Sequence, residues 1–274
     1  TLALDHATRA DSGYYQVYAT NSIGTNSATI FVKVAPAHSE LVEWGNAPWL
    51  SAPADLTTAV DIIAPDQILA LKSDGTVVGW GSGSEGQAAP PEGLSMVVAV
   101  AASPRHSLAL KSDGTVVAWG DDYMGQIEVP AGLSDVVAVA AGSLHSLALK
   151  ADGTVVGWGY NGSGQATPPE DLANVVQIAA GNNISFALKA DGTLVAWGHT
   201  DGGFLPPPSL SGVVSITVGA RHFFALKTDG SFVVWGPAPP DVIAIPPGLS
   251  QVVAIAATED YSIAIKVFGT LVAW

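Results

Sequence analysis

The chain has 274 residues, of which 48% are hydrophobic and only 12% charged, and its formal net charge is −14. It contains no cysteine, which excludes a disulfide framework and any metal site built on thiolates. Its ten basic residues argue against nucleic acid as a partner, because phosphate binding depends on clustered lysines and arginines. No apolar run approaches the ~20 residues that span a bilayer, so we expect no membrane insertion.

The N-terminal segment, residues 1–35, lacks the repeat that organises the rest of the chain. It contains a D-x-G-x-Y-x-V pattern made by Asp11, Gly13, Tyr15 and Val17. The pattern resembles the final strands of an immunoglobulin-like domain, in which a corner tyrosine lies two residues before a cysteine. We therefore interpret residues 1–35 as the C-terminal strands of an incomplete immunoglobulin-like domain, and residues 36–40 as a linker.

From residue 41 to residue 274 the sequence repeats about every 39 residues. Tryptophans recur at intervals of 36, 39, 39, 39, 38 and 39 residues, at Trp44, Trp80, Trp119, Trp158, Trp197, Trp235 and Trp274. A fixed period of this length indicates stacked supersecondary units that bury their apolar faces against one another. We interpret this tryptophan series as structural.

Each unit contains three predicted strands, as residues 136–159 illustrate. The strands are the runs V-V-A-V-A-A, S-L-A-L-K and T-V-V-G-W. Short runs rich in valine and bounded by glycine or proline favour strands over helices. An Asp-Gly pair separates the second and third runs in five units, which predicts a tight hairpin with a primed turn.

The pattern predicts an all-β fold, a β-propeller with three-stranded blades. The third strand is apolar on both faces and no helix is predicted to cover it, so neighbouring sheets must do so. The alanine-rich first strand suits the innermost position. A β-solenoid is the structural alternative, although its repeats are usually shorter and lack such hairpins. Six units are complete and Leu41–Gly45 is a lone third strand, so we expect the intact protein to continue and close a seventh blade.

The repeat G-x-x-H-S-L-A-L-K-x-D-G-T-V-V-x-W-G-x-x-x-x-G-Q resembles that of the regulator of chromosome condensation family. The match is clearest at Gly142–Gln165 and Ser103–Gln126. Typical members have four-stranded blades, whereas the short unit found here is closer to the β-lactamase inhibitory protein II type, which has seven blades. In that type, aromatic and acidic residues of the matching loops contact the inhibited enzyme.

No catalytic, cofactor-binding or metal-binding motif is predicted. Three units place a histidine at one repeat position, and the other units place Gln67, Ile184 and Tyr261 there. This tolerance favours structural hydrogen bonds for His106, His145 and His222 over a ring of metal ligands. A G-x-G-x-x-G pattern from Gly81 to Gly86 precedes prolines rather than a helix, so we interpret it as a turn.

Strand direction predicts that the turn after the first strand and the loop after the tryptophan share one face. These loops vary between units, and aromatic and arginine side chains are typical binding anchors. The candidate protein-binding residues are Trp49, Arg105, Asp121, Asp122, Tyr123, Tyr160, Phe204, Arg221 and Tyr261.

The leading hypothesis is a non-catalytic protein-binding module in a larger, secreted or cell-surface bacterial protein, with a partner whose identity is unknown. One alternative is a structural or adhesive cell-surface repeat without a specific partner. Another is inhibition of β-lactamase, which the resemblance suggests. Nucleotide exchange on a small GTPase, as in eukaryotic members of the family, is disfavoured by the shortened blades and the immunoglobulin-like neighbour.

Overall fold

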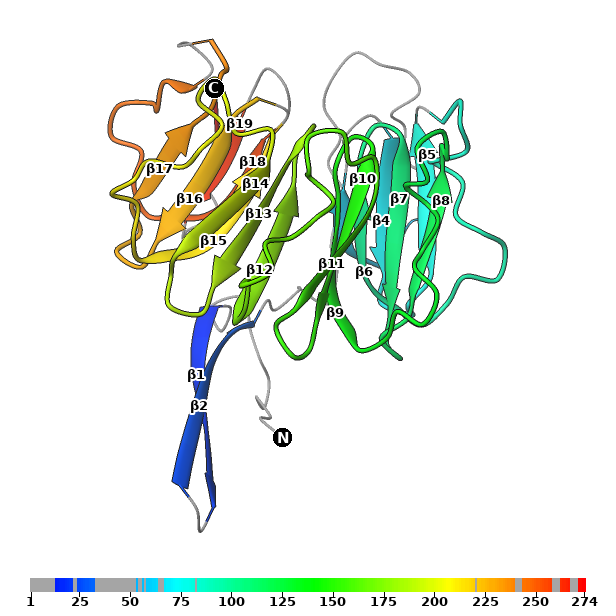
Figure 1. Cartoon of the computed structure of the whole chain (residues 1–274), viewed down its shortest axis with the longest axis horizontal. Helices are drawn as coiled ribbons and strands as arrows, with labels where there is room; N and C mark the ends of the chain where they lie inside the picture. Colours follow the sequence, from blue (N-terminus) through cyan, green and yellow to red (C-terminus); the bar gives the residue numbers. More distant parts are fainter. Residues whose placement is uncertain are drawn as a thin grey trace.

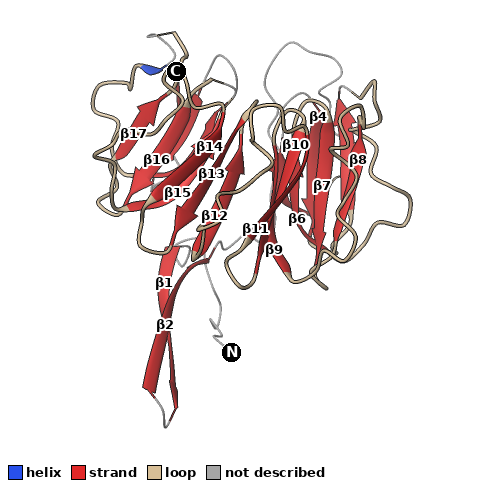
Figure 2. Ribbon diagram, in the orientation of Figure 1, coloured by secondary structure: helices blue, strands red, loops and turns tan. Residues whose placement is uncertain are grey.

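The computed structural model describes residues 13–21, 24–32, 53, 56, 58–63, 67–81, 83–219, 221–239, 243–257, 262–266 and 271–274. The described part of the chain is built from β-strands joined by turns and loops (Figures 1 and 2). In it, no helix has the length and apolar character that a membrane crossing requires.

The N-terminal segment contains an antiparallel hairpin. Strand β1 (Gly13–Asn21) pairs with β2 (Gly24–Val32), with a register that runs from Gly13 opposite Val32 to Asn21 opposite Gly24. A two-stranded hairpin is compatible with the end of an immunoglobulin-like domain, but that assignment stays a prediction. The predicted linker, the lone strand Leu41–Gly45 and Trp44 lie outside the described residues.

The described residues also form six antiparallel sheets of three strands each, as the sequence predicts. Blade 1 contains β3 (Ala59–Ile63), β4 (Gln67–Lys72) and β5 (Val77–Gly81); blade 2 contains β6 (Val97–Ala102), β7 (His106–Lys111) and β8 (Val116–Gly120); blade 3 contains β9 (Val136–Ala141), β10 (His145–Lys150) and β11 (Val155–Gly159). Blade 4 contains β12 (Val175–Ala180), β13 (Ile184–Lys189) and β14 (Leu194–Gly198); blade 5 contains β15 (Val213–Val218), β16 (Phe223–Lys227) and β17 (Phe232–Trp235); blade 6 contains β18 (Val252–Ala257), β19 (Ser262–Lys266) and β20 (Leu271–Ala273).

The blades stack side by side with their first strands innermost. In every blade the second strand lies in the middle of the sheet. The first strand of each blade contacts the first strand of the next, from β3 and β6 through to β15 and β18. Radial stacking of this kind is the propeller arrangement, and the small alanine side chains of the first strands allow the blades to converge. The connecting loops gather at the two ends of the strands (Figure 2).

The Asp-Gly turns differ from the predicted primed turns. In blade 2, Gly114 N–H donates to the Lys111 carbonyl at 2.9 Å, and Lys111 N–H donates to the Thr115 carbonyl at 2.9 Å. Only the glycine has positive φ, at 79°, whereas a type I′ turn needs positive φ at both central residues. The hairpin is therefore a three-residue loop closed by a left-handed glycine. The Asp113 carboxylate, which accepts bonds from Thr115 N and Oγ1 at 3.0 and 2.6 Å, stabilises this longer turn.

The apolar core is divided among the blade interfaces. One cluster joins Leu69 and Leu71 of blade 1 to Val100 and Trp119 of blade 2, and equivalent clusters lie between blades 2 and 3, 3 and 4, and 4 and 5. Each of these blades is covered by its neighbours. This explains why both faces of the third strands are apolar and why the chain contains few charged residues. Four tryptophans of the series, Trp119, Trp158, Trp197 and Trp235, are buried in these interfaces.

Candidate protein-binding surface

The turns after the first strands and the loops after the tryptophans lie on the same face, as strand direction predicts. Main-chain hydrogen bonds join them in blades 2 to 5: for example, Asp121 N donates to the Arg105 carbonyl at 2.9 Å, and His199 N to the Asn183 carbonyl at 2.8 Å. We call this surface the loop face. Its described residues are 83–86, 103–105, 121–125, 142–144, 160–164, 181–183, 199–204, 221 and 236–239.

A buried glutamine fixes the apex of three of the described loops. In blade 2, the Gln126 side-chain oxygen accepts a hydrogen bond from Met124 N at 2.8 Å. The main-chain carbonyl of the same residue accepts two bonds from blade 3, from Ser146 Oγ at 2.8 Å and Trp158 Nε1 at 2.9 Å. Gln87 and Gln165 repeat this arrangement. One residue therefore ties each of these three loops both to its own apex and to the next blade.

The histidines of the repeat extend this network, which confirms that they are structural hydrogen-bonding residues. His106 Nε2 lies 2.8 Å from Ser146 Oγ, whose hydrogen is donated to the Gln126 carbonyl, so the imidazole must carry its proton on Nε2. His145 contacts Ser185 and His222 contacts Ser262 in the same way, each at 2.8 Å.

The repeat histidines are buried, and burial disfavours the charged imidazolium. It lowers the pKa of His106 and of His145 to about 4, with the charge of His106 adding to the effect on His145. Burial also lowers the pKa of His222. The three imidazoles are therefore neutral at neutral pH, and those of His106 and His145 donate from Nε2.

The interface between blades 4 and 5 replaces this polar network with an apolar one. Blade 4 has Ile184 at the histidine position, and blade 5 has Phe223 at the serine position. Both side chains are fully buried in one cluster that also contains Trp235. The two substitutions are complementary, because a lone histidine or serine here would lose its partner. Comparing the histidine position of each unit with the serine position of the next unit would have shown this pairing in the sequence.

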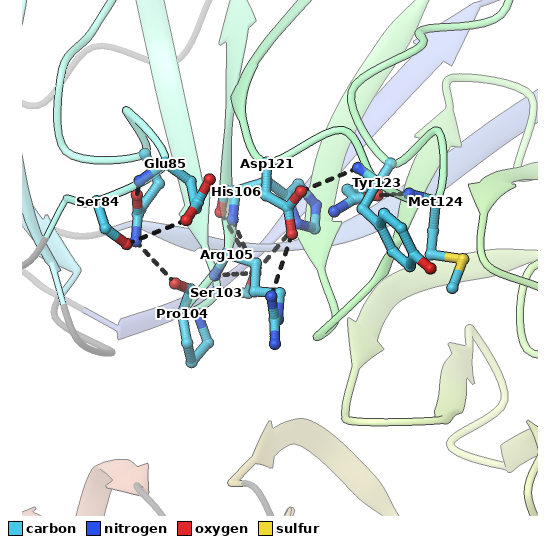
Figure 3. A network of polar contacts seen from close by, with 11 residues as sticks. Ser84, Glu85, Ser103, Pro104, Arg105, His106, Asp121, Tyr123 and Met124 are labelled. Atoms are coloured by element: carbon cyan, nitrogen blue, oxygen red, sulfur yellow. Dashed lines mark hydrogen bonds and ion pairs between the residues drawn. The ribbon is translucent and has the colours of Figure 1, made fainter.

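Tyr123 is the most exposed aromatic side chain on the described loop face, with 81% of its surface accessible (Figure 3). Its N–H donates to Asp121 Oδ1 at 2.9 Å, while Asp121 Oδ2 lies 3.3 Å from Arg105 Nη1. The Asp121 side chain is only 11% exposed and the Arg105 side chain 57% exposed. The aspartate therefore positions the backbone under the tyrosine, and the arginine lies beside it with part of its guanidinium open to solvent.

The other predicted anchors have different environments. The Tyr160 ring is half-buried and lies over Gly162 of its own loop. Phe204 is partly buried: it occupies the glutamine position, its carbonyl accepts the Trp235 Nε1 bond at 3.0 Å, and its ring packs 5.9 Å from that of Phe223. Asp122 and Arg221 are exposed. Trp49 and Tyr261 lie outside the described residues.

The opposite face, formed by the Asp-Gly hairpins, is uniform. Each described hairpin contains a lysine–aspartate pair, such as Lys72 with Asp74 at 3.3 Å and Lys150 with Asp152 at 3.7 Å. Bonds from the Thr76 hydroxyl and then from its N–H lower the pKa of Asp74 to about 2, with a smaller contribution from Lys72. These exposed contacts stabilise the turns and recur from hairpin to hairpin. The residues that vary between blades, and could therefore distinguish partners, lie on the loop face.

Comparison with known proteins agrees with the architecture. Residues 97–126, 136–165 and 175–203 match the regulator of chromosome condensation (RCC1) repeat, and the match falls on blades 2, 3 and 4. No curated protein sequence matches the chain.

Several solved structures share the fold. Prp20p from Saccharomyces cerevisiae is 22% identical with a TM-score of 0.65, over 77% of this chain and 70% of that protein. The ectodomain of the receptor kinase CR4 from Physcomitrella patens is 20% identical with a TM-score of 0.64, over 76% of this chain and 59% of that ectodomain. Human WBSCR16 is 23% identical with a TM-score of 0.61, over 73% of this chain and 70% of that protein. At these identities the likeness establishes the RCC1-like propeller fold alone.

Proposed function

We propose that this chain is a non-catalytic protein-binding module that presents its loop face to a partner protein. The observation that carries the proposal is the construction of the loop at Tyr123. An exposed aromatic side chain stands on a backbone held by Asp121 on one side and by Gln126 on the other. A rigid aromatic side chain loses little conformational entropy on binding, and tyrosine and arginine are both enriched in binding hot spots.

The structural neighbours lend support of a general kind. The structure of Prp20p was described together with its binding to Gsp1p and histones, and yeast RCC1 was also solved bound to Kap60. At least one protein that contains this fold thus binds other proteins. We further propose that the module belongs to a secreted or cell-surface bacterial protein, in which the immunoglobulin-like segment would act as a neighbouring module.

The proposal is tested by measuring affinity for a partner isolated with the immobilised chain. Tyr123→Ala and Arg105→Ala should each weaken binding by about tenfold or more, the effect of removing a hot-spot side chain worth ~1.4 kcal/mol. Val137→Ala is the matched control, because this valine is 53% exposed and lies at the start of β9, near the opposite face. Equal affinities for all four proteins would show that the partner does not use the loop face.

A further inference from the structure

An open basin lies on the loop face where blades 4 and 5 meet. Its volume is about 310 Å³, and the described residues that line it are Asn182, Asn183, His199, Phe204, Arg221 and Pro237. They come from the first turns and the post-tryptophan loops of both blades. The basin lies above the one described blade interface in which Ile184 and Phe223 replace the histidine and serine.

Hydrogen bonds from neighbouring residues engage the side-chain oxygens of both asparagines. The Gln165 oxygen accepts a bond from Ser163 N at 2.9 Å, so its amide nitrogen must be the atom 3.3 Å from Asn183 Oδ1. Asn182 Oδ1 likewise accepts a bond from Ser143 Oγ at 2.7 Å. The oxygens of both asparagines are therefore occupied by protein groups. Their Nδ2 groups, for which the described residues provide no acceptor, remain as donors for a ligand.

Two further polar side chains, Arg221 and His199, line the basin. Arg221 carries a permanent positive charge and five N–H donors in a planar fork, enough to bind more than one acceptor. His199 is exposed, and its ring meets that of Phe204 edge-on at 5.1 Å between centroids. Among the described lining residues there is no carboxylate, in a chain whose formal net charge is −14. The apolar lining comes from Phe204 and Pro237.

We propose that this basin binds a carboxylate group of the partner protein, with the methylene stem of the acidic residue packed on Phe204 and Pro237. The inference rests on the proposed function, because it assigns one part of the loop face to one chemical group of the partner. A carboxylate matches the lining by its charge and by its two acceptor oxygens, which can receive bonds from a guanidinium and amides together. Tyr123 and this basin would then contribute an aromatic anchor and an electrostatic contact from separate blades.

The binding of small carboxylates tests the basin without the partner. Three probes are titrated into ¹⁵N-labelled protein: N-acetylglutamate α-amide, N-acetylglutamine with a free α-carboxylate, and the neutral N-acetylglutamine amide. We expect the first probe to produce saturable shifts in the side-chain amide resonances of Asn182 and Asn183, and the neutral probe to produce none. A response to the second probe alone would identify a chain terminus instead of an acidic side chain as the source of the carboxylate. Equal shifts with all three, or no shifts, would overturn the proposal.

Isosteric variants give the matched comparison. Asn183→Asp keeps an acceptor for Gln165 while replacing the donor group with a negative charge, so it should weaken binding of N-acetylglutamate α-amide by about tenfold or more. The control is Asn174→Asp, which makes the same charge change outside the loop face, at a position where blade 3 already has Asp135. Equal losses in both variants would indicate a general charge effect and overturn the assignment.

The same variants separate this inference from the proposed function. If Tyr123→Ala weakens partner binding and Asn183→Asp leaves it unchanged, the loop face is the binding surface and the assignment of the basin is wrong. If the small carboxylates bind the basin but neither variant affects the partner, the proposed binding face is wrong.

Discussion

The buried histidines make the stability of the propeller depend on pH in a window that the structure defines. His106 and His145 are inaccessible to solvent, and each donates from Nε2 to a serine of the next blade. We expect the double variant His106→Gln, His145→Gln to stay folded at neutral pH, because Gln67 occupies the same position in blade 1 and donates to Ser107 Oγ at 3.2 Å. Glutamine does not titrate, so this variant should lack the pH dependence that the imidazoles cause.

The sign and size of the effect follow from the pKa values. Each pKa is about 4 in the folded protein and 6.5 in the absence of burial, so the unfolded chain binds more protons between these values. Stability is therefore complete above pH 6.5 and falls as the pH drops toward 4. A tenfold change in proton affinity is worth about 1.4 kcal/mol, which gives a loss of about 2 kcal/mol per imidazole at pH 5.

Urea unfolding followed by tryptophan fluorescence, at a series of pH values from 7.5 to about 4.5, measures this loss. The aspartates of the hairpins also have lowered pKa values, but their contribution is lost only below about pH 4, so it falls outside the window. The free energy of unfolding of the original chain should decline by several kcal/mol more than that of the double variant. Parallel declines in the two proteins would refute the reasoning.

Three further outcomes follow from single contacts. Trp158→Phe removes the bond to the Gln126 carbonyl and leaves a small void, so it should lower the free energy of unfolding in urea by about 2–3 kcal/mol. Thr76→Ala should raise the pKa of Asp74 from about 2 toward 3.8 in an NMR titration, because the threonine hydroxyl is the main cause of its lowering. Ile184→His should destabilise the chain by about 2 kcal/mol or more in urea unfolding, since blade 5 offers no hydroxyl to the buried imidazole.

Much of the fold could be predicted because it is encoded locally and then repeated. The run Val136–Ala141, the Asp-Gly pairs and the recurring tryptophans each predict an element by residue type and spacing, and six copies reinforce the inference. The turn type was predicted wrongly because Asp-Gly fits two hairpin geometries. The choice between the two geometries depends on bonds such as that from Thr115 to Asp113, and Thr115 lies outside the dipeptide.

The candidate surface could be predicted only in part. Strand direction places Arg105 and Asp121 on one face, but it does not reveal that they are paired or that the aspartate supports Tyr123. Phe204 was predicted as a candidate anchor because it lies in a variable loop after a tryptophan. Its true environment depends on Phe223 in the next blade, a contact between residues of different units that a survey of loop composition does not detect.

The single apolar junction among the described blade interfaces limits how the gene can gain or lose repeats by recombination. Deleting blade 3 would bring His106 opposite Ser185, a pairing already used between blades 3 and 4. Deleting blade 4 would instead bring His145 opposite Phe223 and leave a buried N–H without an acceptor. Unequal crossing-over is therefore tolerated among the first blades but penalised across the junction of blades 4 and 5. Blades 4 and 5 must consequently stay adjacent, and the loops that line the basin stay next to one another.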